Sequence, residues 1–175
     1  MTYMLPNAET RVQQLTKLFL LLIRYSLRCG GVEIAPGGGG VLIWLSGESF
    51  AWPLKILELV RSGLIWLPVS IGLSAFKRLQ RHDTACEHAL KKHAPKGFAY
   101  LWVVGVHPSY AGRGLGKQLI QSAMDAMRSR GYSACLLRTE NPKNVGLYKH
   151  LGFQQIHTDI PSGSGQRFWL FSQEL

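Results

Sequence analysis

Apolar side chains along this chain alternate between two kinds of spacing. In some segments they recur every three to four residues, which predicts helices with one buried face. The predicted helices cover Ala8–Leu27, Pro53–Ser62, Leu73–His93 and Leu115 to about Arg130. Elsewhere the apolar residues form short runs between glycines and prolines, which is typical of strands. The predicted strands cover Gly31–Ala35, Val41–Leu45, Gly97–Val106, Ala134–Arg138, Gly152–Thr158 and Arg167–Ser172.

Two connections are less regular. The apolar segment Leu64–Leu67 is compatible with a helix or with an extended chain. Pro36 and the four glycines Gly37–Gly40 separate the first two strands and form a turn. No helix follows this tract, so we expect it to be a flexible linker and not a ligand-binding loop.

The segment Val106–Lys117 carries the strongest chemical signal. It joins a predicted strand to an amphipathic helix and has glycine at 112, 114 and 116. Glycines let the backbone turn tightly and leave its N–H groups uncovered. These N–H groups lie at a helix N-terminus, which favours phosphate, and Arg113 and Lys117 add positive charge. The segment therefore predicts a binding site for a pyrophosphate-bearing ligand.

Two familiar nucleotide loops do not fit this segment. A dinucleotide fingerprint needs a third glycine where Lys117 stands. A P-loop needs glycine where Ala111 stands and a hydroxyl for magnesium where Gln118 stands. Nucleotide hydrolysis is therefore disfavoured.

A second motif follows, from Arg138 to Phe153. Asn141 can cap the next helix, and Pro142 suits its first position. We expect Gly152 to end the helix. The predicted buried stripe of this helix consists of Val145, Leu147, Tyr148 and Leu151. A lone tyrosine in such a stripe is either a core residue with its hydroxyl at the surface or a functional group, and the pattern alone leaves both open.

In order and distance the two motifs resemble those of the GNAT acetyltransferase superfamily. The loop resembles V-x-P-x-x-[RQ]-G-x-G-[IL]-G, and the second motif resembles N-x-x-[AN]-x-x-[LF]-Y-x-x-x-G-F. The matching loop positions are Val106, Pro108, Gly112, Gly114, Leu115 and Gly116. The loop departs from the pattern at Ala111, where the family has Arg or Gln. The departure implies weaker binding of coenzyme A.

The resemblance implies an α/β (α+β) fold. This GNAT fold has a mixed central sheet with a splayed pair of parallel strands, flanked by helices. We expect a single domain over 1–175, with the CoA-binding half at about 97–155. Since only a few residues precede Ala8, we expect the usual first strand and helix of the family to be lacking. An exposed sheet edge invites pairing, so a homodimer is a further expectation.

The resemblance also implies roles for particular residues. Tyr148 is the expected general acid that protonates the departing thiolate. The main chain of Val104 and Val106 is expected to bind the pantetheine arm, and a backbone N–H near Val106 to polarise the thioester carbonyl. Asn141 is expected beside the pantetheine or phosphates. The loop residues expected to bind pyrophosphate are Ala111, Gly112, Arg113, Gly114, Gly116 and Lys117.

The general base is not identified by the sequence. The strand before the loop has no carboxylate. His107 is the nearest titratable side chain to this strand and is a weak candidate. Glu48, Glu140 and Asp159 are weaker candidates still, since solvated or capping roles suit them better. For the acceptor, the indoles of Trp44, Trp52, Trp66 and Trp102 are candidates to line a pocket, with ordinary packing as the alternative.

Composition limits the remaining options. The net charge is +10, with the basic residues spread over several helices. This favours a polyanionic cosubstrate and disfavours both nucleic acid and polyamine acceptors. Three widely spaced cysteines indicate buried, reduced thiols, and the histidines show no metal spacing. The apolar run Leu18–Ile23 is far shorter than the roughly 20 residues that span a bilayer. We therefore expect no metal, no membrane association and a cytoplasmic location.

Together these features predict an acetyl-CoA-dependent N-acetyltransferase. The acetyl group would pass directly to an amine, and a small molecule is a better acceptor than a protein. The alternative is a CoA-binding or regulatory module with weak catalysis, which the residue Ala111 and the missing strand carboxylate favour.

Overall fold

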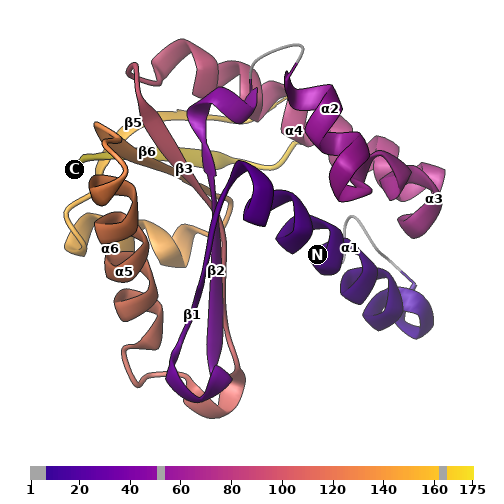
Figure 1. Cartoon of the computed structure of the whole chain (residues 1–175), viewed down its shortest axis with the longest axis horizontal. Coiled ribbons are helices and arrows are strands. Elements are labelled where there is room, and N and C mark those ends of the chain that lie inside the picture. The colour runs from indigo at the N-terminus through magenta and orange to yellow at the C-terminus, as the bar shows by residue number, and fades with distance from the viewer. Residues whose placement is uncertain (1–6, 51–53, 162–164) are drawn as a thin grey trace.

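The computed structural model describes residues 7–50, 54–161 and 165–175. Its centre is a six-stranded sheet in the order β1-β2-β3-β4-β6-β5, with helices on both faces (Figure 1). Among the described strands, only β3 and β4 pair in parallel, and every other neighbouring pair is antiparallel. The strands are β1 (Gly30–Ile34), β2 (Gly40–Ser46), β3 (Phe98–Val106), β4 (Ala134–Thr139), β5 (Gln154–Asp159) and β6 (Phe168–Glu174). This confirms the predicted mixed α/β class.

The helices form two layers, with α1–α4 on one face of the sheet and α5 and α6 on the other (Figure 1). Their bounds are α1 (Ala8–Cys29), α2 (Leu54–Ser62), α3 (Leu67–Ile71), α4 (Leu73–His93), α5 (Leu115–Ser129) and α6 (Pro142–His150). The ambiguous segment after α2 is helical, because the 3-10 turn Leu64–Trp66 leads directly into α3. Among the described helices, none combines the length and hydrophobicity needed to cross a bilayer.

The two parallel strands separate part of the way along their length. They pair from Phe98↔Ala134 to Leu101↔Leu137 and no further. Beyond this point β3 stays with β2, and β4 stays with β6 as far as Thr139. The central sheet is therefore open between β3 and β4 towards the ends that lead into α5 and α6.

A bulge in β3 lies at the point of separation. Adjacent β2 residues pair with Leu101 and Val103, so Trp102 is the extra residue. The bulge shifts the alternation of side chains along the strand. Val104 and Val106 consequently pack with Leu101 in the core beneath α5, whereas Trp102 packs on the face covered by α1–α4.

The glycine tract between β1 and β2 is an ordered turn, so the predicted flexible linker is wrong. It contains the 3-10 turn Pro36–Gly38, and the carbonyl of Gly39 accepts a 2.9 Å hydrogen bond from the His107 N–H. A Cβ on Gly39 would lie 2.8 Å from the ring of Tyr110. The absence of side chains lets the hairpin tip pack directly against the segment that follows β3.

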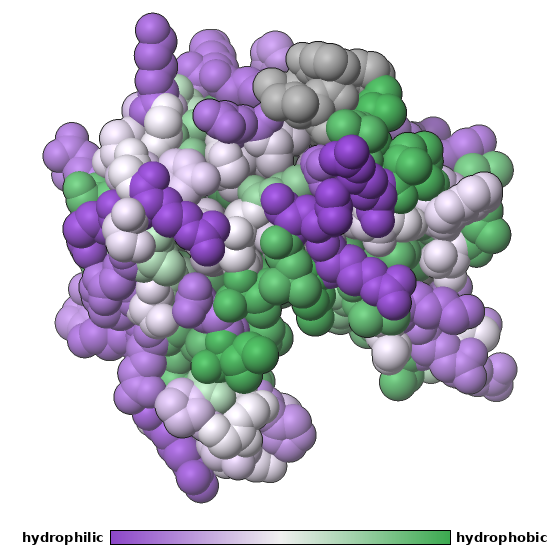
Figure 2. Space-filling model, in the orientation of Figure 1, coloured by the Kyte–Doolittle hydropathy of each residue, from purple (hydrophilic) through white to green (hydrophobic). Residues whose placement is uncertain are grey.

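Part of the molecule's apolar surface remains uncovered. Hydrophobic side chains are visible over the half formed by α1–α4 (Figure 2). Between residues 8 and 93, the strongly exposed large hydrophobic residues include Val12, Val60, Trp66, Val69 and Leu73. At the sheet edge formed by β1, Ile34 is 71% exposed. The homodimer expected through an exposed edge stays a prediction.

Candidate active site

The loop between β3 and α5 presents backbone N–H groups to solvent. Gly112 and Gly114 adopt left-handed conformations with φ near +77° and +76°. Gly114 is the N-cap of α5, so the first turn of that helix has N–H groups with no partner within the helix. Within the described part of the chain, the N–H groups of Gly112, Gly114, Gly116 and Lys117 meet no acceptor. This arrangement suits an anion of several oxygens.

The first part of the same loop is held by its own hydrogen bonds. The Ala111 N–H donates to the Pro108 carbonyl at 3.0 Å. The His107 Nδ1 accepts from the Ser109 N–H at 3.3 Å, and the His107 ring packs edge-on against Tyr110. The Arg113 guanidinium lies 5.4 Å from the centre of the Tyr110 ring. Tyr110 therefore supports the loop, and His107 has a structural role in it.

The second motif positions α6 through Thr139 and Asn141. The Asn141 side-chain oxygen accepts from the Lys143 N–H at 3.1 Å, as predicted for a cap. The buried hydroxyl of Thr139 accepts from the Asn141 N–H at 3.2 Å and from the Asn144 side chain at 3.4 Å. At the other end, Gly152 has a φ of +94°, so the helix ends as expected. The role of Thr139 was not predicted.

Tyr148 lies on the buried face of α6. It belongs to the same apolar cluster as Val104 and Val106, and its ring packs against Phe153 and Phe171. Burial raises the pKa of the Tyr148 hydroxyl, and the negative charge of Glu140 raises it further. Among the described residues, the Tyr148 hydroxyl has no hydrogen-bond partner. The phenol therefore stays protonated and able to donate.

One member of the predicted stripe on α6 is not buried. Leu147 is 49% exposed, whereas Val145 and Leu151 are partly buried in the cluster with Tyr148. The expectation for Leu147 is therefore wrong. The reason is that α6 has only nine residues and its contacts fall on β4 and β5, which leaves one flank open.

An ion-pair network lies on the opposite face of the sheet. Arg138 of β4 contacts Asp83 of α4 at 2.8 Å and Glu140 at 2.6 Å. Burial lowers the pKa of Arg138, but Tyr100, Asp83 and Glu140 outweigh burial and hold it well above the usual value. Burial also raises the pKa of Tyr100 to about 12. Glu140, a weak candidate for the general base, is thus engaged with Arg138.

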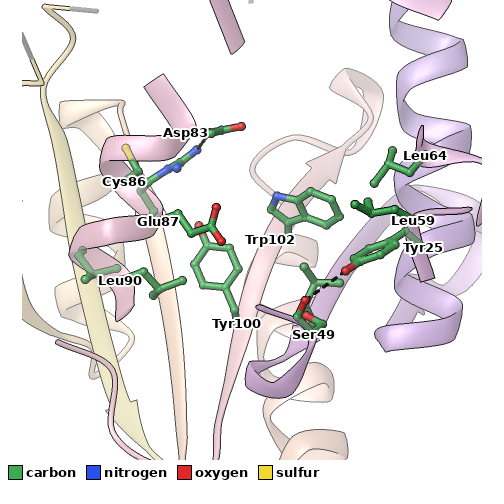
Figure 3. Close-up of a pocket in the computed structure, with 13 residues that line it drawn as sticks. Tyr25, Ser49, Leu59, Leu64, Asp83, Cys86, Glu87, Leu90, Tyr100 and Trp102 are labelled. Atoms are coloured by element: carbon green, nitrogen blue, oxygen red, sulfur yellow. Dashed lines mark hydrogen bonds and ion pairs between the residues drawn. The ribbon is translucent and has the colours of Figure 1, made fainter. Parts of the chain in front are cut away.

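A pocket of about 170 Å³ adjoins this network (Figure 3). Leucine and aromatic side chains form most of its walls, and α4 contributes Asp83 and Glu87. Trp102 and Arg138 line it as well. Each of them directly follows the last paired position of its strand. The pocket therefore opens at the point where β3 and β4 separate.

The four tryptophans considered for an acceptor pocket have different positions. Trp102 lines the pocket. Trp44 is fully buried on the other face of the sheet, and Trp66 is 66% exposed. Trp52 lies outside the described residues. Within the described ranges, no three His, Cys, Asp or Glu side chains are grouped as metal ligands would be.

Comparison with protein families identifies the region that contains both motifs. Residues 71–153 match the model of the acetyltransferase (GNAT) family. This segment is just under half of the chain. It contains β3, the glycine loop, α5, β4 and α6.

Similar proteins of known name are acetyltransferases. The chain is 38% identical over 79 residues to mycothiol acetyltransferase from Rhodococcus erythropolis, covering 42% of this chain and 26% of the relative. It is 28% identical over 93 residues to an acetyltransferase from Agrobacterium fabrum, covering 53% of this chain and 68% of the relative. The chain thus spans about a quarter of the length of the mycothiol acetyltransferase that it matches.

Solved structures show the same fold. An agmatine N-acetyltransferase has a TM-score of 0.58 at 14% identity, covering 94% of this chain and 95% of that chain. The polyamine N-acetyltransferase of Drosophila melanogaster has a TM-score of 0.57 at 18% identity, covering 79% of this chain and 71% of that chain. At these identities the likeness concerns the fold alone. Residues 71–153, which contain both sequence motifs and the separated parallel strands, therefore resemble the acetyltransferase (GNAT) family, and the chain shares the fold of these solved structures.

Proposed function

We propose that this chain is an acetyl-CoA-dependent N-acetyltransferase that passes its acetyl group directly to a small amine. The observation that carries the proposal is the opening of the sheet between β3 and β4. The glycine loop and Tyr148 lie on the α5–α6 side of this opening, and the pocket lies on the α1–α4 side. Cosubstrate and acceptor can therefore meet between the two strands from opposite faces.

The residues present suit coenzyme A. The unpaired N–H groups of Gly112, Gly114, Gly116 and Lys117 can bind its pyrophosphate, and the side chains of Arg113 and Lys117 add positive charge. A Cβ on Gly112 or Gly114 would meet nothing within 4 Å, so the loop is open to a ligand. The β3 main chain at Val104 and Val106 has no β4 partner and can bind the pantetheine arm. Asn141, at the start of α6, can reach the same molecule.

Acetyl transfer then needs one attack and three proton movements. The acceptor nitrogen attacks the thioester carbon while a backbone N–H near Val106 stabilises the charge on the carbonyl oxygen. The carbon–sulfur bond breaks, and Tyr148 gives its proton to the thiolate. The nitrogen releases one proton to solvent, and Tyr148 regains one from solvent. The products are the N-acetyl amine and coenzyme A with its thiol restored.

The chemistry of the nearby cysteine supports direct transfer over an acetyl-cysteine intermediate. Cys86 lines the pocket, but burial raises the pKa of its thiol to about 11, although Arg138 opposes the shift. A thiol with that pKa is protonated near neutral pH and is a poor nucleophile. An acetyl-cysteine intermediate at Cys86 is therefore disfavoured.

A weakly catalytic CoA-binding module remains the second candidate. The observation in its favour is Ala111, which replaces the Arg or Gln of the family motif and whose N–H is already bonded to Pro108. Such a module would bind acetyl-CoA but release thiol slowly for every amine.

Two measurements on the full chain test the proposal. Calorimetry with acetyl-CoA should show binding to one site per chain, and thiol release should then depend on added amine. The variant Tyr148→Phe should bind acetyl-CoA as tightly as the parent but release thiol more slowly. Binding without amine-dependent thiol release would favour the second candidate, and absence of binding would refute both.

A further inference from the structure

If the chain has the function proposed above, the shape and charge of the pocket limit the size and charge of the acceptor. Trp102 and Arg138 are the first residues beyond the last β3–β4 pair, and both side chains line the pocket. An amine in the pocket thus lies beside the gap in which the thioester would sit. The volume of about 170 Å³ is well below the roughly 300–1,000 Å³ of pockets that hold drug-sized ligands. The acceptor must therefore be compact.

One end of the pocket is an aromatic corner. The rings of Tyr25 and Trp102 meet at 71°, with 6.1 Å between their centres. The Tyr25 hydroxyl donates to the Ser49 carbonyl at 3.3 Å, which fixes the ring in place (Figure 3). Leu59 and Leu64 lie beside this corner. A flat apolar group can pack against one ring face and one ring edge here.

The opposite end carries carboxylates. Asp83 and Glu87 stand one turn apart on α4, and both line the pocket. Asp83 is paired with Arg138, whereas Glu87 is paired with Lys91 at 3.1 Å. The Lys91 side chain is half exposed, and exposed pairs of this kind are weak. Among the residues that line the pocket, the carboxylates therefore lie on the α4 wall, whereas Tyr25, Leu59 and Leu64 are uncharged. Glu58, which lies near Tyr25, is already paired with Arg28 and Arg61.

We propose that the acceptor is a compact primary monoamine with a flat aromatic body. Its ring packs in the Tyr25–Trp102 corner, and its ammonium group is held near Glu87 before it loses a proton to solvent and attacks. A diamine would place its second charge against the apolar corner, where a charged group loses its hydration. A protein N-terminus would bring more chain than the pocket admits.

Three acceptors and one assay test the substrate class. Thiol release from acetyl-CoA is measured with 2-phenylethylamine, 1,5-diaminopentane and a tripeptide with a free N-terminus. We expect kcat/KM for 2-phenylethylamine to exceed the other two by roughly 10-fold or more, the effect of one well-packed ring. A faster reaction with the diamine or the tripeptide would overturn the inference. No turnover of any of the three, with acetyl-CoA bound in calorimetry, would overturn it too.

Variants separate this inference from the proposed function. Trp102→Leu should raise KM for 2-phenylethylamine by roughly 10-fold and leave acetyl-CoA binding in calorimetry unchanged. The matched control is Trp66→Leu, because Trp66 is 66% exposed and does not line the pocket. Glu87→Gln should also raise KM for 2-phenylethylamine. The difference in KM between this variant and the parent should shrink at high salt. Equal KM values in all three variants would refute the acceptor class, whereas failure to bind acetyl-CoA in the parent would refute the proposed function.

Discussion

The guanidinium of Arg138 lies 2.8 Å from the carboxylate of Asp83, and this contact joins β4 to α4. The same guanidinium contacts Glu140, which directly precedes the N-cap residue of α6. One side chain thus connects the wall of the proposed acceptor pocket with the start of the helix that carries Tyr148. We infer that Arg138 fixes the position of the α4 wall of the pocket relative to α6 and Tyr148.

Replacing Arg138 should destabilise the fold measurably. In Arg138→Met, the carboxylates of Asp83 and Glu140 lose their shared counter-ion at a position where the arginine side chain is only 20% exposed. We expect the free energy of unfolding in urea to fall by about 2–3 kcal/mol, less than for a fully buried pair because both carboxylates touch solvent. The control Arg128→Met breaks the exposed pair with Asp125 and should cost less than about 1 kcal/mol. Equal losses in the two variants would contradict this reasoning.

The pH dependence of kcat should show whether Tyr148 is the general acid. Burial, with the added charge of Glu140, raises the pKa of its hydroxyl, so the acid form persists beyond the ordinary value of about 10. The midpoint of the alkaline decline of kcat should therefore lie above pH 10 in the parent. In Tyr148→Phe, kcat should fall roughly 100-fold near neutral pH, and the alkaline decline of kcat should be absent. Tyr132→Phe, a tyrosine packed edge-on against Trp44, should keep the parent profile. A parental kcat in Tyr148→Phe would exclude Tyr148 as the acid.

The parts of the site that depend on local sequence were predictable. The glycines at 112 and 114 have the left-handed φ that makes glycine necessary, and Asn141 and Pro142 occupy the cap and first positions of α6. Each of these features depends on a few neighbouring residues. Composition and spacing therefore carried enough information to place them before any tertiary contact was known.

The parts that depend on distant segments were not predictable. Nothing local indicates that Arg138 meets Asp83, because α4 and β4 come together only when the sheet forms. The bulge at Trp102 shifts the side-chain alternation along β3, so the packing of Val104 and Val106 beneath α5 did not follow from spacing. Four consecutive glycines suggest flexibility, yet Gly39 is required there because the Tyr110 ring fills the space of a side chain.

The hairpin tip should affect cosubstrate binding through this contact. A methyl group in Gly39→Ala would lie 2.8 Å from the Tyr110 ring and must displace it, together with the loop that Tyr110 supports. We expect acetyl-CoA affinity in calorimetry to fall roughly 10-fold. Gly146→Ala is the matched control, because its new methyl group meets nothing within 4 Å and alanine favours a helix. That variant should bind normally and unfold at a slightly higher urea concentration. Normal binding by Gly39→Ala would show that the tip does not support the loop.

The two ends of α5 offer the sharpest test of the phosphate site. Gly114 and Gly131 both have left-handed backbones, with φ of +76° and +79°, and a Cβ on either meets nothing within 4 Å. Alanine at each position should therefore cost a similar amount of unfolding free energy, about 1–2 kcal/mol, from backbone strain alone. Only Gly114 belongs to the loop with unpaired N–H groups, so only Gly114→Ala should also weaken acetyl-CoA binding, by roughly 10-fold. Urea unfolding and calorimetry on both variants measure the two effects separately. If Gly131→Ala weakened binding as much as Gly114→Ala, the loss would reflect general destabilisation of α5, and the glycine loop would lose its assignment as the pyrophosphate site.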